Sequence, residues 1–297
     1  MVVAIMGAGS VGSYLGGVLA AAGQEVVLIG RQAHVDAVNE HGLRITRADG
    51  DVVVQPRATT DPSVVAEADV VLCCIKSTGT AQAAADITNH VRADAVVVSV
   101  QNGIGNAEVL ADGLPQVDVL ASVIYVAVGM AGPGHVRYHG AGRLILSESA
   151  GQARVADVFA GSAVEVEAVP DVQVALWAKL LANCVWNPLS AITGLTYGQL
   201  WASPGVPQVV QDIARECLAV GRAEGVDLPE SLLDDASGLA HTMPNQLSST
   251  AQDLQRGRRT EIDHLTGEIT RRGDALGIDT PTCRLLTALV HAMEPQE

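Results

Sequence analysis

Aromatic and basic residues are both scarce in this sequence. Aromatic side chains make up 3% of the 297 residues, which disfavours the stacking platforms that proteins use to bind bases or sugars. Lysine and arginine together number 18 against 33 acidic residues, for a formal net charge of −15. A nucleic-acid or anionic-membrane partner would require a basic patch, so we expect neither. Any small anionic ligand must instead be bound by individual lysine or arginine side chains.

Cysteines are few, odd in number and without a CxxC motif. They are Cys73, Cys74, Cys184, Cys217 and Cys283. Most stand in apolar surroundings, which favours reduced, buried thiols and a cytoplasmic protein. No cysteine–histidine spacing is typical of a metal site. His135 and His139 are four residues apart, but they stand in the turn-rich stretch GPGHVRYHGAG, so we expect no metal.

Long membrane-spanning apolar runs are also lacking. The N-terminal stretch MVVAIMGAGSVGSYLGGVLAAAG is apolar and its AAAG resembles a signal-peptidase site, yet it has no basic flank and is interrupted by glycines. No other uncharged stretch has the length and composition of a transmembrane helix. The expectation is a soluble, cytoplasmic protein without a membrane partner.

The first thirty residues are the most informative. VVAIM (residues 2–6) is typical of a buried strand, GAGSVG follows at 7–12, a small-residue helix ends near 23, and EVVLIG predicts a second strand. Gly7, Gly9 and Gly12 fit the G-x-G-x-x-G pattern in the strand–turn–helix context that binds dinucleotides. Ser10 and Val11 would lie at the helix N-terminus, whose N–H groups favour a pyrophosphate. The alternative is a glycine-rich turn without a ligand.

The end of the second predicted strand bears on which cofactor is used. An NAD site usually places a carboxylate there for the ribose hydroxyls. Here the strand ends in Ile29-Gly30-Arg31, so a guanidinium stands where the acid would be. That residue suits the 2′-phosphate of NADP, and we expect NADP (NADPH) to be the cofactor. The alternative is an exposed loop arginine.

Further strands alternate with helices up to about residue 168. LRITRADGDVVVQP predicts a hairpin, and buried strands are expected in 68–76, 95–103 and 117–128. HVRYHG and RLILSE look like an antiparallel pair of strands. Such alternation predicts an α/β fold, with a Rossmann-type doubly wound sheet at 1–168 and an all-α C-terminal domain at 169–297.

Two polar residues follow predicted buried strands. Lys76 ends the strand at 68–76, and Asn102 follows the strand that begins at Ala95. Ligands of doubly wound sheets gather beyond the carboxyl ends of the strands, so both residues are candidates for the cofactor site. The alternatives are a solvated strand end for the lysine and a simple turn for Asn102-Gly103.

A polar stripe interrupts the apolar stretch WAKLLANCVWNPLSAI (177–192). Lys179, Asn183 and Asn187 recur every fourth residue, which places them on one face of a helix. Burying these groups is costly unless each has a partner, so the stripe is expected to face a polar ligand. The alternative is a lysine whose amine reaches solvent, beside two amides bonded to neighbouring backbone.

Several separated motifs together resemble the ketopantoate reductase (2-dehydropantoate 2-reductase) family. They are GAGSVG, Arg31, CIKS at 74–77, QNG at 101–103, WAKLLANCVWNPLSAITG at 177–194 and SSTAQDLQRGRRTEID at 248–263. The resemblance covers essentially the whole chain. It implies an oxidoreductase of pantothenate biosynthesis that reduces 2-dehydropantoate to pantoate with NADPH.

Carried over by position, the resemblance also implies site residues. The catalytic residues are Lys179, as general acid, and Glu261. The substrate contacts are Asn102, Asn183, Asn187 and Ser249. The cofactor contacts are Gly7, Gly9, Ser10, Val11, Gly12, Arg31, Lys76 and Asn102. The chemistry agrees, because the keto oxygen that gains negative charge on hydride addition needs a proton or a cation.

Three of these positions have competing interpretations. Ser249 begins S-T-A-Q, which fits a capping box, so it could cap a helix as well as bind a carboxylate. Glu261 stands in GRRTEIDHLTGEI, which predicts a helix, and it could simply pair with Arg258. Pro188 directly follows Asn187, so the helix of the stripe is expected to be disturbed there.

The substrate is expected to be a small 2-keto acid, bound between the two domains with its keto group against Lys179. One rival is a reductase of another 2-keto or 3-hydroxy acid on the same fold. A rival of another class is a non-catalytic sensor that binds NADPH and signals to a partner protein. Helical second domains of this kind often pair, so the sequence allows a homodimer.

Overall fold

A computed structural model describes residues 1–295 and divides the chain into two compact units. Unit 1 is Met1–Val172, and unit 2 comprises the residues from Gln173 onward. This division lies four residues after the boundary expected from the sequence, at the residue where the first helix of unit 2 begins. Among the described residues, no helix has both the length and the apolar character needed to cross a membrane.

Unit 1 is a mixed α/β structure. Its strands are β1 (Val2–Met6), β2 (Glu25–Ile29), β3 (Leu43–Arg47), β4 (Gly50–Val54), β5 (Arg57–Thr59), β6 (Val70–Cys73), β7 (Val96–Ser99), β8 (Asp118–Gly132), β9 (His135–Ser147) and β10 (Glu165–Val169). Its helices are α1 (Ser10–Ala21), α2 (Gln32–His41), α3 (Thr80–Ile87), α4 (Asn106–Gly113) and α5 (Gln152–Phe159), with short 3-10 helices η1 (Pro62–Glu67) and η2 (Ser77–Gly79). The strands and helices alternate as the sequence predicts.

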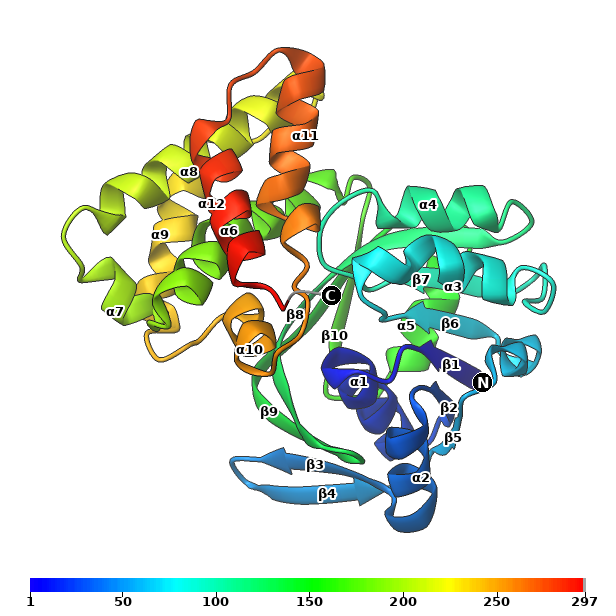
Figure 1. Ribbon diagram of the computed structural model, residues 1–297. Coiled ribbons are helices and arrows are strands. Elements are labelled where there is room, and N and C mark those ends of the chain that lie inside the picture. The colour runs from blue at the N-terminus through cyan, green and yellow to red at the C-terminus, as the bar shows by residue number, and fades with distance from the viewer. Residues whose placement is uncertain (296–297) are drawn as a thin grey trace. The chain divides into compact units, whose positions relative to one another are not determined.

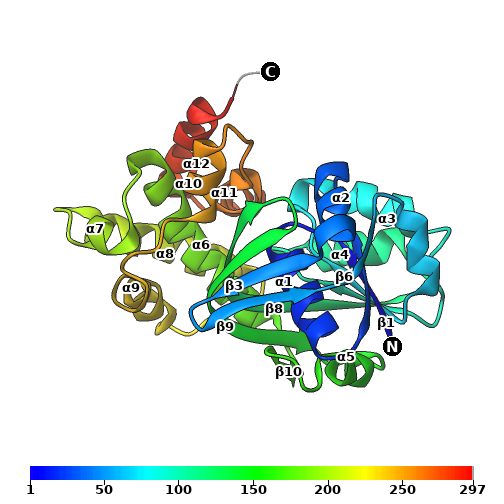
Figure 2. The ribbon, with the colours of Figure 1, turned by 90° about the horizontal axis from the view of Figure 1, so that it is seen from below.

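Part of the sheet is parallel and part is antiparallel. The strand order is β4-β3-β9-β8-β7-β6-β1-β2-β5, with β10 beside β9. The stretch from β8 through β1 to β5 is parallel, while β8 pairs with β9 and β3 with β4 in antiparallel fashion. Figure 2 shows β3 lying beside β9 at this end of the sheet. From β1 the chain passes to β2 on one side and later to β6 on the other, so β1 and β6 flank the point where the strand order reverses.

One strand prediction was wrong. HVRYHG and RLILSE are not an antiparallel pair but two parts of the single strand β9, which pairs with β8 along most of its length. The register shifts between Tyr125 and Ala127, opposite the glycine-rich stretch around Ala141, whose φ is 59°. A bulge therefore occupies the place where the glycines suggested a turn.

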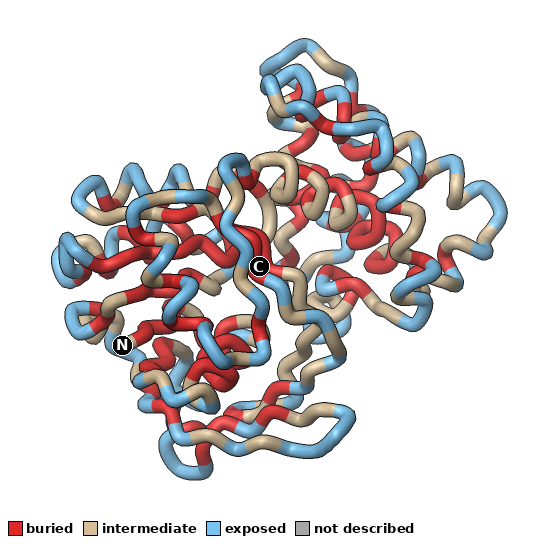
Figure 3. The backbone as a smooth tube through the Cα atoms, turned by 180° about the vertical axis from the view of Figure 1, so that it is seen from behind, coloured by how far each residue is buried: buried red, intermediate tan, exposed pale blue. Residues whose placement is uncertain are grey.

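Both faces of the parallel strands are buried, because alternate residues point to opposite sides. Val3 and Ile5 belong to a core that includes side chains of α1 and α5. Ala4 and Met6 belong to a second core with α3 and α4. Figure 3 shows these strands as almost continuously buried segments. This arrangement explains the unbroken apolar runs in the sequence and leaves the strand ends as the places for polar chemistry.

The regular elements in the described part of unit 2 are all helices (Figure 1). Its elements are α6 (Gln173–Thr193), α7 (Tyr197–Trp201), α8 (Val206–Ala223), α9 (Leu232–Thr242), α10 (Ser249–Gln255), η3 (Ile262–His264), α11 (Thr266–Leu276) and α12 (Pro281–Met293). Helix α6 packs against α8, α10 and α12. It continues through Pro188, so the disturbance expected there does not end the helix.

The core of unit 2 is built on the apolar faces of α6. Trp177 and Trp186 are almost completely buried, and the indole N–H of Trp186 donates to the backbone oxygen of Ala236 at 2.8 Å. Three buried thiols also meet in this core: Cys184 from α6, Cys217 from α8 and Cys283 from α12. The remaining stripe of α6, with its lysine and asparagines, is the polar one.

Candidate functional site

The glycine-rich turn between β1 and α1 has the geometry of a phosphate cradle. Gly7 has a φ of +106°, and a Cβ there would lie 2.7 Å from Ile75. A Cβ on Gly12 would lie 2.2 Å from the backbone oxygen of Gly7, so both glycines are required by the packing of the turn. A Cβ on Gly9 would meet no atom within 4 Å. Because packing does not demand glycine at that position, close approach of a ligand is the better explanation for it.

The N-terminus of α1 is suited to an anion. The helix begins at Ser10 with Gly9 as its N-cap, and no side chain caps it. The first N–H groups of a helix have no intrahelical acceptor, and the helix dipole adds partial positive charge there. The residues of this turn therefore fit the pyrophosphate of a dinucleotide.

Two basic side chains and an asparagine follow parallel strands of the sheet. Arg31 comes two residues after β2 as the N-cap of α2, Lys76 follows β6, and Asn102 follows β7. Parallel strands end at the same edge of a sheet, so all three residues lie at the edge that also carries the glycine-rich turn. Arg31 and Lys76 are exposed, and no carboxylate stands in the turn between β2 and α2.

Side chains that the sequence analysis did not single out support the loop at Asn102. The backbone oxygen of Asn102 accepts from Ser77 Oγ at 2.8 Å and from Asn106 Nδ2 at 2.9 Å. Gln101 Nε2 donates to Thr80 Oγ1 at 2.7 Å, and that hydroxyl lies 3.0 Å from Asn106 Oδ1. The only signal in the sequence was a run of polar residues after a buried strand, and such a run is equally typical of a simple turn.

A buried histidine that was also missed joins three parts of unit 1. Nδ1 of His34, on α2, accepts the N–H of Gly134 at 3.1 Å, while Nε2 lies 3.1 Å from Ser13 Oγ on α1. The Ser13 hydroxyl donates to the backbone oxygen of Ala8, so the imidazole carries its proton on Nε2. Burial lowers the pKa of His34, which keeps the ring neutral. This contact anchors the first turns of α1 and α2.

In unit 2, α6 places the lysine and asparagines on one face, as the four-residue spacing predicts. Lys179 and Asn183 are half-buried and Asn187 is buried. Desolvation by burial lowers the pKa of Lys179 from 10.5 to about 8, and the charge of the Glu261 carboxylate acts in the opposite direction. The amine can therefore exist in both protonation states near neutral pH, as a proton donor requires.

Ser249 and Asn187 meet across α6 and α10. Asn187 Nδ2 donates to Ser249 Oγ at 3.3 Å. The suggested capping role of Ser249 was wrong by one residue: Ser248 is the N-cap, and its Oγ accepts the N–H of Ala251 at 3.0 Å. Ser248 has the extended backbone of a cap, whereas Ser249 is the first residue of the helix. Ser249 is an exposed residue, and its hydroxyl is not the cap.

Glu261 does not lie in the continuous helix expected from GRRTEIDHLTGEI. It stands in an irregular segment just before η3, and α11 begins only at Thr266. Gly257, with a φ of +61°, follows the end of α10. The Thr260 hydroxyl then accepts the N–H of Ile262 at 3.2 Å, so side-chain bonds replace helical ones here.

Each unit thus presents its own set of chemical groups. Unit 1 has a phosphate cradle with cations at the same sheet edge. Unit 2 has an ammonium of lowered pKa under the influence of a carboxylate, on a helix face with two amides and a nearby hydroxyl. The first set can bind a dinucleotide, and the second can bind a small polar acid and supply it with a proton.

Comparison with known proteins finds similar sequences over both units. The family model described as ketopantoate reductase PanE/ApbA matches residues 3–151, and the model of the C-terminal part of that family matches residues 171–294. The 2-dehydropantoate 2-reductase of Halobacterium salinarum is 37% identical over 297 residues, covering 98% of each chain. The enzyme of that name from Streptococcus pyogenes is 31% identical, covering 99% of this chain and 98% of its own.

Solved structures extend the similarity to three dimensions. A PanE/ApbA family ketopantoate reductase from Ralstonia eutropha JMP134 has a TM-score of 0.95 and 52% identity, covering 99% of this chain and 98% of its own. A D-mandelate dehydrogenase solved with NADH and anilino(oxo)acetate has a TM-score of 0.91 and 27% identity, with the same coverage. On these matches, which span both units, the chain is a member of the ketopantoate reductase family of oxidoreductases.

Proposed function

We propose that this protein reduces 2-dehydropantoate to pantoate with NADPH. The observation that carries the proposal is the stripe on α6, where a half-buried lysine of lowered pKa stands under the charge of Glu261 and on the same face as two asparagines. Relatives named 2-dehydropantoate 2-reductase, alike over nearly the whole chain, support the choice of substrate.

The proposed roles follow from the charge that develops in the reaction. When bound, a reduced nicotinamide dinucleotide supplies the hydride that reaches the keto carbon. The keto oxygen then gains negative charge, and the ammonium of Lys179 stabilises that charge and donates the proton. The charge of Glu261 favours the protonated form of Lys179, so the lysine holds its proton at neutral pH.

The remaining polar groups bind and orient. Asn183 and Asn187 offer amide donors to the substrate, and Ser249, bonded to Asn187, extends this row to the N-terminus of α10. The Ser249 hydroxyl is proposed to contact the substrate carboxylate. Asn102, in the loop after β7, is proposed to contact both ligands.

NADPH is proposed rather than NADH because of the charges at the sheet edge. Gly7, Gly9, Ser10, Val11 and Gly12 would hold the pyrophosphate. Arg31 replaces the acid typical of NAD sites, and Lys76 adds a second cation. In a chain of net charge −15, these local cations are what an extra phosphate would require.

The test is an assay of the purified protein for loss of NADPH absorbance with 2-dehydropantoate, repeated with NADH. Turnover with a higher kcat/KM for NADPH is expected. Preference for NADH would remove the proposed role of Arg31. Binding of NADPH without turnover of any 2-keto acid would favour a sensor over an enzyme.

A second candidate is the reduction of a different 2-keto acid. It is favoured by the close structural similarity to D-mandelate dehydrogenase, which was solved with anilino(oxo)acetate. Phenylglyoxylate and pyruvate should therefore be included in the same assay. A kcat/KM for phenylglyoxylate above that for 2-dehydropantoate would identify the protein as an aryl 2-keto acid reductase.

A further inference from the structure

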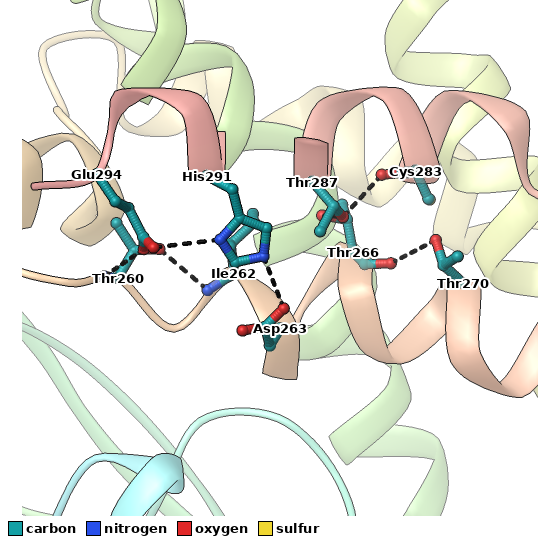
Figure 4. Close-up of polar contacts among 9 residues, drawn as sticks. All are labelled: Thr260, Ile262, Asp263, Thr266, Thr270, Cys283, Thr287, His291 and Glu294. Carbon is teal, nitrogen blue, oxygen red and sulfur yellow. Dashed lines mark hydrogen bonds and ion pairs between the residues drawn. The ribbon is translucent and has the colours of Figure 1, made fainter. Parts of the chain in front are cut away.

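The C-terminal end of α12 carries a polar cluster that the proposed reaction does not use directly. Figure 4 shows His291 between two carboxylates, Glu294 and Asp263. His291 Nδ1 lies 3.2 Å from Glu294 Oε2, and Nε2 lies 2.8 Å from Asp263 Oδ1. The imidazole thus links the end of α12 to η3, the element that directly follows Glu261.

Glu294 in turn binds the residue that precedes Glu261. Glu294 Oε1 accepts the N–H of Thr260 at 2.7 Å and its hydroxyl at 2.5 Å. The Thr260 hydroxyl accepts the N–H of Ile262 at 3.2 Å. The backbone on both sides of Glu261 is therefore fixed by one chain of contacts that begins at α12.

This geometry selects one protonation state of the histidine. Ionised carboxylates only accept hydrogen bonds, so an imidazole between two of them needs a proton on each nitrogen. Burial opposes protonation, but the bonds and charges of Glu294 and Asp263 outweigh it and raise the pKa of His291. The N–H and hydroxyl of Thr260 outweigh burial at Glu294 and lower its pKa.

The acidic residues of α8 and α11, the helices packed against α12, have contacts of their own. Glu216 on α8 accepts the N–H groups of Thr282 and Cys283 at the opposite end of α12. Glu268 on α11 pairs with the two arginines that follow it, and the charge partner of Lys179 on α6 is Glu261. Within residues 1–295, the ion pairs of His291 are those with Asp263 and Glu294.

We infer that His291 and Glu294 are positioning residues for Glu261, forming a clamp that is complete only when His291 is protonated. The inference rests on the proposed role of Glu261 in the reaction. A neutral imidazole can donate to only one carboxylate and turns a lone pair toward the other. As the pH rises through the folded-state pKa of His291, one arm of the clamp is lost and the segment at residues 260–263 becomes less fixed.

The test measures hydrogen–deuterium exchange of the segment 257–265, corrected for the intrinsic pH dependence of amide exchange. In the wild type, exchange should accelerate as the pH rises above about 6.5 and through the raised folded-state pKa of His291, where the imidazole loses its proton. His291→Gln should exchange roughly threefold to tenfold faster at about pH 6, as expected for loss of a charge-assisted contact that is partly exposed. His291→Lys, whose ammonium stays charged, should keep the segment protected across the range.

A matched control lies on the same helix. Arg284→Gln removes an ion pair between α12 and Asp274 of α11, away from the clamp, and should leave exchange at 257–265 unchanged. Equal acceleration in Arg284→Gln and His291→Gln would mean general loosening of α12 and would overturn the inference. Wild-type exchange in His291→Gln at every pH would also overturn it.

Activity separates this inference from the proposed function. If the wild type reduces a 2-keto acid, His291→Gln and Glu294→Gln should lower kcat while leaving the KM for NADPH unchanged. Faster exchange with an unchanged kcat would show that Glu261 does not need the clamp, which refutes the positioning role. If the wild type reduces no 2-keto acid, the proposed function fails, and the exchange experiment still decides whether the clamp exists.

Discussion

Replacing Lys179 by methionine is the sharpest test of the proposed chemistry. The methionine side chain is long and unbranched like that of lysine, but it carries no charge and no ionisable proton. If Lys179 is the general acid, kcat should fall by a factor of roughly 10² to 10⁴, while the Kd for NADPH stays nearly constant. Stopped-flow or steady-state NADPH oxidation measures the first quantity, and quenching of protein fluorescence by the dinucleotide measures the second.

The same substitution has an opposite expected effect on stability. The lowering of the Lys179 pKa from 10.5 to about 8 corresponds to roughly 3 kcal/mol against the ammonium in the folded state. Between these two pH values the unfolded chain binds more protons than the folded one, so wild-type stability rises with pH there. Lys179→Met removes that cost, so its Tm at neutral pH should equal or exceed that of the wild type. The rise in stability with pH above about 8 should also become shallower.

The pH dependence of kcat identifies the acid. Wild-type kcat should fall above about pH 8, where Lys179 loses its proton. Glu261→Gln removes the negative charge that raises the Lys179 pKa, so the decline of kcat with rising pH should begin at lower pH in this variant. A kcat for Lys179→Met within about tenfold of the wild type would refute the assignment. The assignment would also be refuted if kcat of Glu261→Gln declined at the same pH as kcat of the wild type.

Three further predictions concern unit 1. Arg31→Ala should raise the KM for NADPH by roughly tenfold to hundredfold, because a hydrogen bond to a charged group is lost. The KM for NADH should stay almost unchanged in the same assay. Gly12→Ala places a Cβ 2.2 Å from the Gly7 oxygen, so calorimetric titration should show loss of dinucleotide binding, and unchanged binding would contradict the cradle. His34 has a lowered pKa, so its contribution to stability is present above about pH 6.5 and lost as the pH falls toward the folded pKa. Acid unfolding followed by circular dichroism should become less steep in His34→Gln.

The parts of the fold that were predictable depend on local chemistry. The turn at Gly7–Gly12 follows from glycine spacing next to an apolar strand, and the stripe on α6 follows from the helical period. Strand β9 was divided wrongly because glycines around Ala141 normally signal a turn, whereas pairing with β8 carries the strand through a bulge. Beyond the bulge, Tyr125 pairs with Arg143, and this separation exceeds the few residues over which a turn pattern is recognised.

The site shows the same limit. Glu261 was placed by family resemblance, and the helix predicted around it was wrong because Thr260 bonds to Glu294, 34 residues away. A contact of that range competes with helix formation and is invisible to periodicity. The supporting side chains at Thr80 and Asn106 were missed for a similar reason, since their polarity suggested only a loop.

The distribution of the thiols has a practical consequence. Cys73 and Cys74 belong to unit 1, and the thiols of α6, α8 and α12 belong to unit 2. Desolvation raises the pKa of Cys73 to about 12 and also raises that of Cys184, so the native thiols resist alkylation. Pulsed alkylation followed by mass spectrometry of tryptic peptides would thus measure the unfolding rate of each unit separately, without any introduced probe.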